Sequence, residues 1–224
     1  LESVGLRAES GLTALNSYEN RVYQFLCEDR KRYVVKFYRP ERWTEEQIHE
    51  EHRFSHDMSE AEIPAVAPLA INENTLHHHQ GYMFTVFPSV GGRQYEIDNL
   101  DQLEWVGRFL GRIHQVGRES LFAARPTMGL DEYFAQPLEV LAKCPLIPKS
   151  LREPFLQATD NLINTTKEYW HTDWQPLRLH GDCHPGNMLW RDGPLFVDMD
   201  DARNGPAIQD LWMLLHGDQS EQRL

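Results

Sequence analysis

Runs of apolar, β-branched and aromatic residues, separated by polar turns, fill the first third of the chain. Runs of this composition and length are typical of β-strands. The predicted strands cover residues 12–15, 21–26, 33–38, 66–72 and 81–87. The first three predict an antiparallel meander, and the three histidines at 77–79 are predicted to lie in a polar, solvated turn before the last strand.

Helical spacing occurs once among these strands and dominates after residue 92. Thr44 and Gln47, three residues apart, fit a capping box and predict a helix that ends near Met58. Further helices are predicted over residues 100–117, 150–170 and 208–215. The pattern predicts an α+β protein in two parts: residues 1–88, an antiparallel sheet with one helix, and residues 89–224, which are mainly helical.

A dense group of polar residues covers 180–187 and is followed, eleven residues later, by Asp198. A predicted hairpin lies between them and would return Asp198 to the side of Asn187. Phosphoryl transfer needs a carboxylate that orients the acceptor hydroxyl and oxygen ligands that hold magnesium. In protein kinases the catalytic aspartate and the metal-binding asparagine are five residues apart, as Asp182 and Asn187 are here. The spacing predicts an ATP- and magnesium-dependent phosphotransferase.

These residues also carry a resemblance. His180 to Asn187 resembles the HGDxHxxN motif of aminoglycoside phosphotransferases, choline kinases and related kinase-like enzymes. Further segments resemble the same family: 17–23, 110–114, 196–198 and 210–211. Segments 87–93 and 200–206 are most similar to a bacterial branch of protein serine/threonine kinases. The resemblance covers nearly the whole chain and implies a two-lobed protein-kinase-like fold and a role in bacterial stress response.

The resemblance implies a role for several positions. Asp182 would be the catalytic base, and Asn187 and Asp198 would bind Mg²⁺. Asp210 would brace the loop that carries Asp182. Lys36 would contact the phosphates of ATP, with Glu51 as its ion-pair partner and Glu50 as the alternative. Ser17 would meet the phosphates in a turn without glycine, and the linker with Phe87 and Ser89 would hold adenine through its backbone.

The formal net charge is −12, from 22 basic and 34 acidic residues. This excess argues against nucleic acid or an anionic membrane as a partner. Three separated cysteines indicate a reducing compartment, and no apolar run has the length of a signal sequence or membrane span. We expect a cytoplasmic monomer. Members of the family continue with several more helices, so the C-terminal lobe is expected to be incomplete at its C-terminal end.

Several alternatives remain open from the sequence. His180 and His184 could bind zinc, although Gly181 and Pro185 disfavour the helix that this spacing suits. Cys183 could be a nucleophile beside His184. The acceptor could be a protein serine or threonine, including one on the chain itself, or the hydroxyl of an amino alcohol, sugar or aminoglycoside. A pseudokinase that acts as a nucleotide-binding scaffold is the third possibility.

Overall fold

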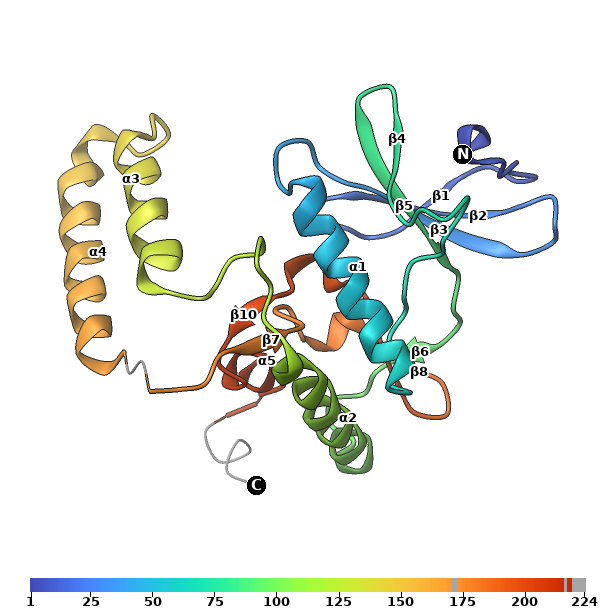
Figure 1. Cartoon of the computed structure of the whole chain (residues 1–224). Coiled ribbons are helices and arrows are strands. Elements are labelled where there is room, and N and C mark those ends of the chain that lie inside the picture. The colour runs from blue at the N-terminus through green and yellow to red at the C-terminus, as the bar shows by residue number, and fades with distance from the viewer. Residues whose placement is uncertain (171–172, 216, 219–224) are drawn as a thin grey trace.

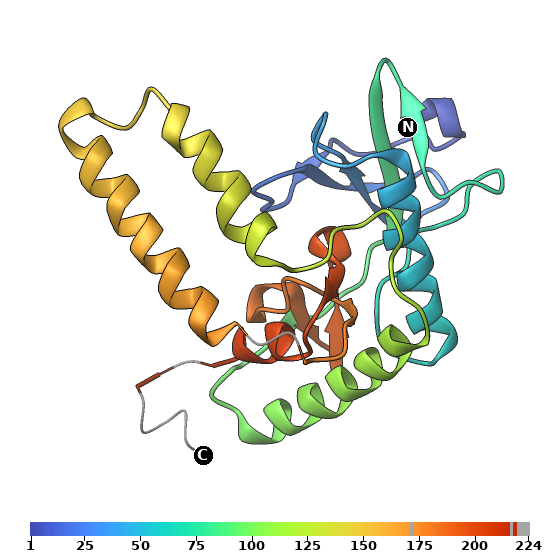
Figure 2. The same ribbon diagram turned by 60° about the vertical axis from the view of Figure 1, so that its left-hand side comes forward.

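The computed structural model describes residues 1–170, 173–215 and 217–218. These residues form an antiparallel sheet, a body of helices and short strands, and a helical hairpin that projects from the body (Figure 1). Turning the molecule shows the hairpin and the body as separate arms joined at one end (Figure 2). Residues 219–224, part of the predicted helical region, lie outside the described residues. Among the described residues, no helix is both long and apolar enough to cross a membrane.

The sheet has five strands in the order β1-β2-β3-β5-β4, and all neighbours are antiparallel. The strands are β1 (Thr13–Ala14), β2 (Arg21–Leu26), β3 (Arg32–Phe37), β4 (His77–His79) and β5 (Tyr82–Pro88). The predicted three-stranded meander is confirmed as β1, β2 and β3. A core of Phe25, Val35, Phe84 and Val86 lies on the sheet.

Two predictions in this region are wrong. Residues 66–72 form no strand, because Pro68 has no N–H and interrupts any ladder. The segment makes isolated backbone bonds: Val66 N–H donates to the Phe196 carbonyl, Leu69 N–H donates to the Val86 carbonyl, and Ile71 forms an isolated bridge with Asn74. The histidines at 77–79, predicted as a turn, form the edge strand β4, and the tight turn follows them at Gln80 and Gly81, both with positive φ.

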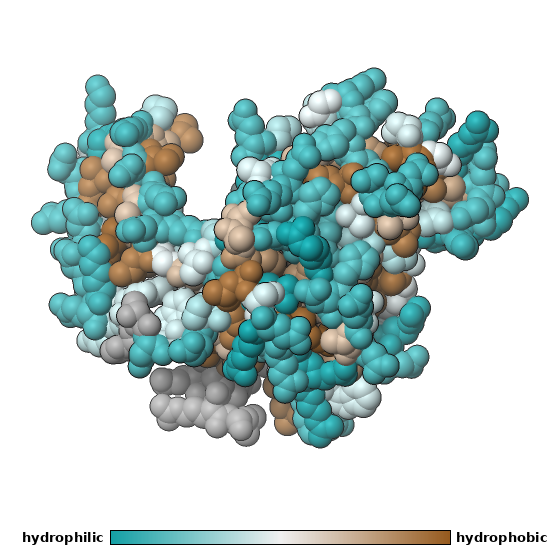
Figure 3. Space-filling model, in the orientation of Figure 1, coloured by the Kyte–Doolittle hydropathy of each residue, from teal (hydrophilic) through white to brown (hydrophobic). Residues whose placement is uncertain are grey.

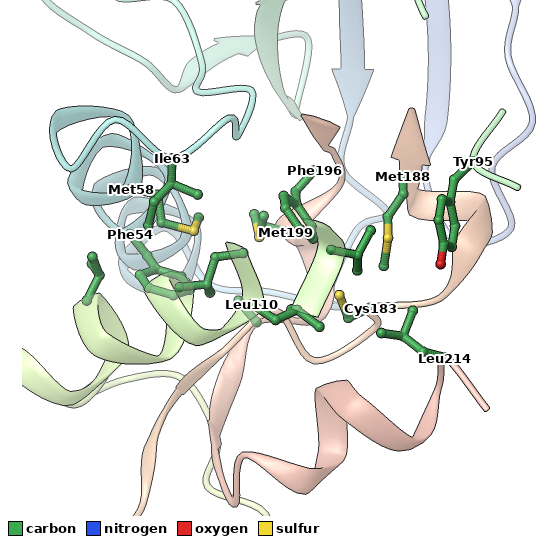
Figure 4. Packing of buried hydrophobic residues seen from close by; sticks show 14 of the residues in the cluster. Phe54, Met58, Ile63, Tyr95, Leu110, Cys183, Met188, Phe196, Met199 and Leu214 are labelled. Atoms are coloured by element: carbon green, nitrogen blue, oxygen red, sulfur yellow. The ribbon is translucent and has the colours of Figure 1, made fainter. Parts of the chain in front are cut away.

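Helix α1 (Glu45–Glu60) joins the sheet to the body. The predicted capping box is confirmed: Gln47 N–H donates to Thr44 Oγ1 at 3.3 Å, and Thr44 N–H donates to Gln47 Oε1 at 2.9 Å. Ile48, near the start of α1, packs beside the sheet, whereas Phe54 and Met58 pack into the core of the body. Figure 4 shows the two latter side chains pointing toward Leu110 and Phe196. One helix therefore fixes the two regions relative to each other.

The body is built on α2 (Leu100–Glu119), which packs on a two-stranded sheet of β7 (Leu177–Leu179) and β10 (Arg203–Gly205). A side chain at Gly117 would collide with the Arg178 carbonyl, so glycine allows this close contact. A second small sheet has the order β6-β8-β9, with β6 (Arg93–Gln94), β8 (Met188–Trp190) and β9 (Pro194–Phe196). Helix α5 (Ile208–Trp212) is shorter than predicted.

The projecting hairpin consists of η2 (Asp131–Ala135), α3 (Gln136–Lys143) and α4 (Lys149–Tyr169). Helix α4 was predicted, whereas α3 was not. Among the described residues of these three elements only Ile163 is buried. Apolar side chains therefore lie on the surface of the hairpin, where hydrophobic patches are visible (Figure 3).

Candidate active site

Lys36 lies on β3, opposite Val22 on one neighbouring strand and Thr85 on the other. It is only 4% exposed, so its charge needs partners within the protein. Its Nζ lies 2.9 Å from Glu51 Oε1, 2.9 Å from Asp200 Oδ1 and 3.3 Å from Asp198 Oδ1. Three carboxylates from two distant segments thus meet at one lysine.

The protonation states of this cluster follow from burial and from the neighbouring charges. Burial lowers the pKa of Lys36, but Glu51 and Asp200 outweigh it and hold the pKa well above its usual value. Burial raises the pKa of Asp200, yet Lys36 and Arg42 lower it to about 2. Burial also raises the pKa of Glu51, and here Lys36 and Arg125 oppose the rise without cancelling it. Lys36 is therefore charged at neutral pH, and Asp200 is ionised.

The loop between β7 and β8 carries Asp182 and Asn187. Asn187 Nδ2 donates to the Asp182 carbonyl at 2.9 Å and to Asp182 Oδ2 at 3.0 Å. The Asp182 side chain is 35% exposed and so reaches solvent. Gly181 has φ 85°, and a side chain there would collide with the Asp201 carbonyl. The loop that carries Asp182 therefore passes directly against the segment that follows Asp198.

Asp210 on α5 binds the start of this loop through hydrogen bonds to its backbone. Its carboxylate is fully buried and accepts hydrogen bonds from His180 N–H at 3.1 Å and Gly181 N–H at 2.9 Å. His114 Nε2 on α2 lies 3.0 Å from the same carboxylate. Asp210 thus ties the start of the loop that carries Asp182 to α2 and α5, which matches the bracing role that the resemblance implies for it.

The geometry around His180, His184 and Cys183 disfavours both a zinc site and a cysteine nucleophile. His180 Nε2 lies 3.1 Å from the Val197 carbonyl, and His184 Nδ1 accepts the Gly186 N–H at 2.9 Å. In the described part of the chain no group of three or more His, Cys, Asp or Glu residues could hold a metal ion. Burial, with Asp210 and Asp182 nearby, raises the pKa of Cys183 well above its usual value, so this thiol is not an ionised nucleophile.

The β8–β9 hairpin brings Asp198 back toward Asn187, since Val197 N–H donates to the Asn187 carbonyl at 3.0 Å. Asp198 has φ 62°, a conformation that is uncommon outside glycine and that occurs often at functional sites. Its side chain is 41% exposed. Because Asn187 uses Nδ2 toward Asp182, its Oδ1 remains as an oxygen ligand. An amide oxygen and a carboxylate suit Mg²⁺, so the donor set fits this metal.

The three other predicted nucleotide-binding residues, Ser17, Phe87 and Ser89, have backbone partners of their own. Ser17 Oγ accepts the Asn20 N–H at 3.3 Å and so closes the turn between β1 and β2. Phe87 pairs with Val34 in the sheet, and Ser89 N–H donates to the Arg32 carbonyl at 3.1 Å. Since Pro88 has no N–H and that of Ser89 is used, adenine would need other backbone groups of this linker.

Three residues of the cluster had no assigned role in the sequence analysis. Asp200 entered the sequence analysis only within the segment 200–206, yet it is 4% exposed and faces Lys36. Arg42 lies 2.7 Å from Glu19 Oε2 in the β1–β2 turn and 3.0 Å from Asp201 Oδ1. Arg125 donates to Glu51 Oε2 at 3.0 Å. Neither arginine lies in a recognisable motif, so only tertiary structure identifies them.

The chain matches the phosphotransferase enzyme family over residues 11–223. It therefore belongs to this family. Its curated relatives include stress response kinase A of Escherichia coli (strain K12), which is 62% identical over 220 residues, or 98% of this chain. Serine/threonine protein kinase RdoA of Salmonella typhimurium (strain LT2) is also 62% identical over 98% of the chain. The chain spans 67% of the length of each of these two relatives.

Solved structures of the same fold include two small-molecule kinases. An amicoumacin kinase, in complex with AMP-PNP, Ca²⁺ and its ligand, superposes with a TM-score of 0.76 at 20% identity, covering 95% of this chain and 66% of that one. A microcompartment-associated aminopropanol kinase has a TM-score of 0.72 at 15% identity, covering 92% and 69% respectively. At this identity the likeness establishes the two-lobed kinase-like fold and nothing finer.

Proposed function

We propose that the chain carries the nucleotide-binding and catalytic machinery of an ATP- and magnesium-dependent protein serine/threonine kinase. One observation carries the proposal: Lys36, Glu51 and Asp198 meet at one point, and the Asp182–Asn187 pair lies on the loop next to it. The names of the relatives support a protein acceptor and a role in stress response. A cytoplasmic monomer with lobes 1–88 and 89–224 remains part of this proposal.

The proposed mechanism assigns each residue a task. Bound ATP would supply the phosphoryl group, and Mg²⁺ would offset the charge on its phosphates. Asn187 Oδ1 and the Asp198 carboxylate would hold the metal. Lys36, kept charged by Glu51, would bind phosphate oxygens. Asp182 would accept a hydrogen bond from the serine or threonine hydroxyl and take its proton as the new P–O bond forms, while the bond from the γ-phosphorus to the bridging oxygen breaks and ADP leaves. Most of the catalysis would come from positioning and charge stabilisation.

A small-molecule acceptor is the second candidate, and one observation favours it. Only η4 (Met199–Asp201), β10 and the first turn of α5 separate Asp198 from Asp210, and β10 is paired with β7. This leaves no room for a long activation loop. The scaffold alternative has less support, because Lys36, Asp182, Asn187 and Asp198 are all present.

The test is transfer of labelled γ-phosphate from ATP with Mg²⁺ by the chain, to a basic protein, to the chain itself and to aminopropanol. Asp182→Asn should reduce transfer at least ~1,000-fold and leave nucleotide affinity nearly unchanged. Asp192→Asn is the matched control, because this exposed aspartate lies in the turn of the neighbouring hairpin. Label on aminopropanol but on no protein would overturn the protein-kinase assignment. If the chain shows no transfer and also binds no nucleotide, the kinase proposal for this chain is overturned.

A further inference from the structure

Arg125 lies in the loop between α2 and η2, and its side chain is completely buried. Its guanidinium donates hydrogen bonds to two separate parts of the chain, helix α1 and residues 200–202. Nε donates to the Gln47 carbonyl at 2.8 Å, and Nη2 donates to Glu51 Oε2 at 3.0 Å. Nη1 donates to the carbonyls of Asp200 at 2.8 Å and Ala202 at 2.7 Å. The guanidinium also lies 4.4 Å from the centre of the Trp43 ring.

The contact with Glu51 divides the two oxygens of one carboxylate between two cations. Oε1 faces Lys36 Nζ at 2.9 Å, and Oε2 faces Arg125. Glu51 is 2% exposed, so an oxygen without a partner would be costly to bury. Arg125 therefore fixes the orientation of the carboxylate that pairs with Lys36.

Glu50 strengthens the same connection through the backbone. Its Oε1 accepts the Ala123 N–H at 2.7 Å, and its Oε2 accepts those of Ala124 at 3.0 Å and Arg125 at 2.8 Å. Two consecutive glutamates of α1 thus bind one loop. The Glu50 side chain binds main-chain N–H groups of the loop, and the Glu51 side chain binds the side chain of Arg125. Helix α1 cannot move away from residues 123–125 without breaking these bonds.

We propose that Arg125 is a positioning residue for phosphate and metal binding, an inference that rests on the proposed function. It holds Glu51 on Lys36 and holds the backbone of residues 200–202, which directly follow Asp198. It thereby sets the spacing between the phosphate-binding lysine and the metal-binding aspartate. The task needs the planar, five-donor fork of arginine, because the guanidinium serves four acceptors at once, and the three donors of a lysine would not reach them.

The variants are Arg125→Met, Arg125→Lys and, as a matched control, Arg178→Met. Arg178 is also buried and also contacts α1, with Nη1 2.6 Å from Asp57 and Nη2 2.9 Å from the Val116 carbonyl. It contacts α1 at the end far from Lys36. A structural role alone would make Arg125→Met and Arg178→Met behave alike.

The first measurement is the affinity for a non-hydrolysable ATP analogue with Mg²⁺, by calorimetry on the folded chain. We expect Arg125→Met to weaken it about 10-fold or more, Arg125→Lys to weaken it less, and Arg178→Met to change it less than ~2-fold. Equal affinities for Arg125→Met and Arg178→Met would overturn the inference. If Arg125→Met does not fold, Arg125→Lys decides, and wild-type affinity in that variant overturns the inference. No binding by the wild-type chain would instead contradict the proposed function.

The second measurement needs no nucleotide. Hydrogen–deuterium exchange on the free chain should become faster in residues 47–52 and 199–202 with Arg125→Met. With Arg178→Met the increase should fall near residues 54–58. A double-mutant cycle completes the test: in a Glu51→Gln background, Arg125→Met should weaken analogue binding by less than half of its effect in the wild type. Full additivity, or the same exchange pattern in both arginine variants, would contradict a positioning role.

Discussion

The ion cluster around Lys36 and the α3–α4 hairpin are built on opposite principles. In the cluster, charged side chains from four distant segments are buried, and each has several partners. In the hairpin, the contacts are local and apolar side chains lie exposed, with Leu146 87% and Val140 70% accessible. Buried charges are costly unless they are paired, whereas an exposed apolar side chain contributes little to folding. Substitutions in the cluster should therefore cost far more than substitutions in the hairpin.

Lys36→Met gives the largest expected effect. The change removes the cation that three carboxylates share. Two of these carboxylates, those of Glu51 and Asp200, are almost fully buried. Breaking a buried pair by removing one partner typically costs about 3–5 kcal/mol. We expect the free energy of unfolding, from urea denaturation followed by circular dichroism, to fall by that amount. An unchanged urea midpoint with an unchanged slope would show that the cluster does not stabilise the fold.

The second prediction concerns the response of the cluster to acid. The pKa of Asp200 is about 2 in the folded protein, below its usual value of 3.8. The unfolded chain therefore binds more protons between these values, and the stabilisation is present above pH 4 and is lost as the pH falls toward 2. The shift corresponds to roughly 2 kcal/mol. We expect the difference in unfolding free energy between wild type and Asp200→Asn to shrink by about this amount from pH 5 to pH 2.

Comparing the two proteins cancels the contributions of carboxylates that do not interact with Asp200. Glu51 has the opposite sign: its raised pKa, to which Asp200 contributes, favours the folded state as the pH falls. A wild-type protein and an Asp200→Asn variant that lose stability in parallel would mean that Asp200 does not interact with Lys36 and Arg42 in solution.

The sequence predicts the local parts of this comparison well. The capping box at Thr44, the meander and the order of Asp182, Asn187 and Asp198 depend on neighbouring residues, which the sequence displays directly. The prediction of a strand at 66–72 ignored Pro68, and the turn predicted at 77–79 ignored the pairing available at the sheet edge. These errors arise because composition alone does not say which backbone groups find partners.

The non-local parts could not be predicted from one sequence. The acidic run 198–201 offers several carboxylates, and only the folded structure shows that Asp200 is the buried one that faces Lys36. Arg125 is distant from Glu51 in sequence and lies in a loop without periodic pattern. The partner of Lys36 is different: the sequence analysis named Glu51, with Glu50 as the alternative, and the structure pairs Glu51 with Lys36 and places the backbone amides of residues 123–125 on Glu50.

Thr44→Ala tests helix α1, which joins the sheet to the body, and should have an intermediate effect. The variant loses the hydrogen bond from Gln47 N–H to Thr44 Oγ1 at the start of α1. Loss of such a cap typically costs about 1 kcal/mol. We expect a fall of this size in the unfolding free energy, and Thr44→Ser, which keeps the hydroxyl, should recover most of it. Equal losses in the two variants would indicate that the methyl group, not the cap, is responsible.

Leu146→Ser in the α3–α4 connection should have the smallest effect. Its side chain is 87% exposed, so the substitution removes almost no buried apolar surface. Changes at such positions usually alter stability by less than about 0.5 kcal/mol. We expect the urea midpoint of Leu146→Ser to match that of the wild type within this limit, and its affinity for the ATP analogue to be unchanged. A loss above 1 kcal/mol would mean that Leu146 is buried in solution, and a concentration-dependent midpoint in the wild type alone would identify a second copy of the chain as the covering surface. Either result would remove the contrast between a cluster that depends on each of its partners and a hairpin whose surface contributes little.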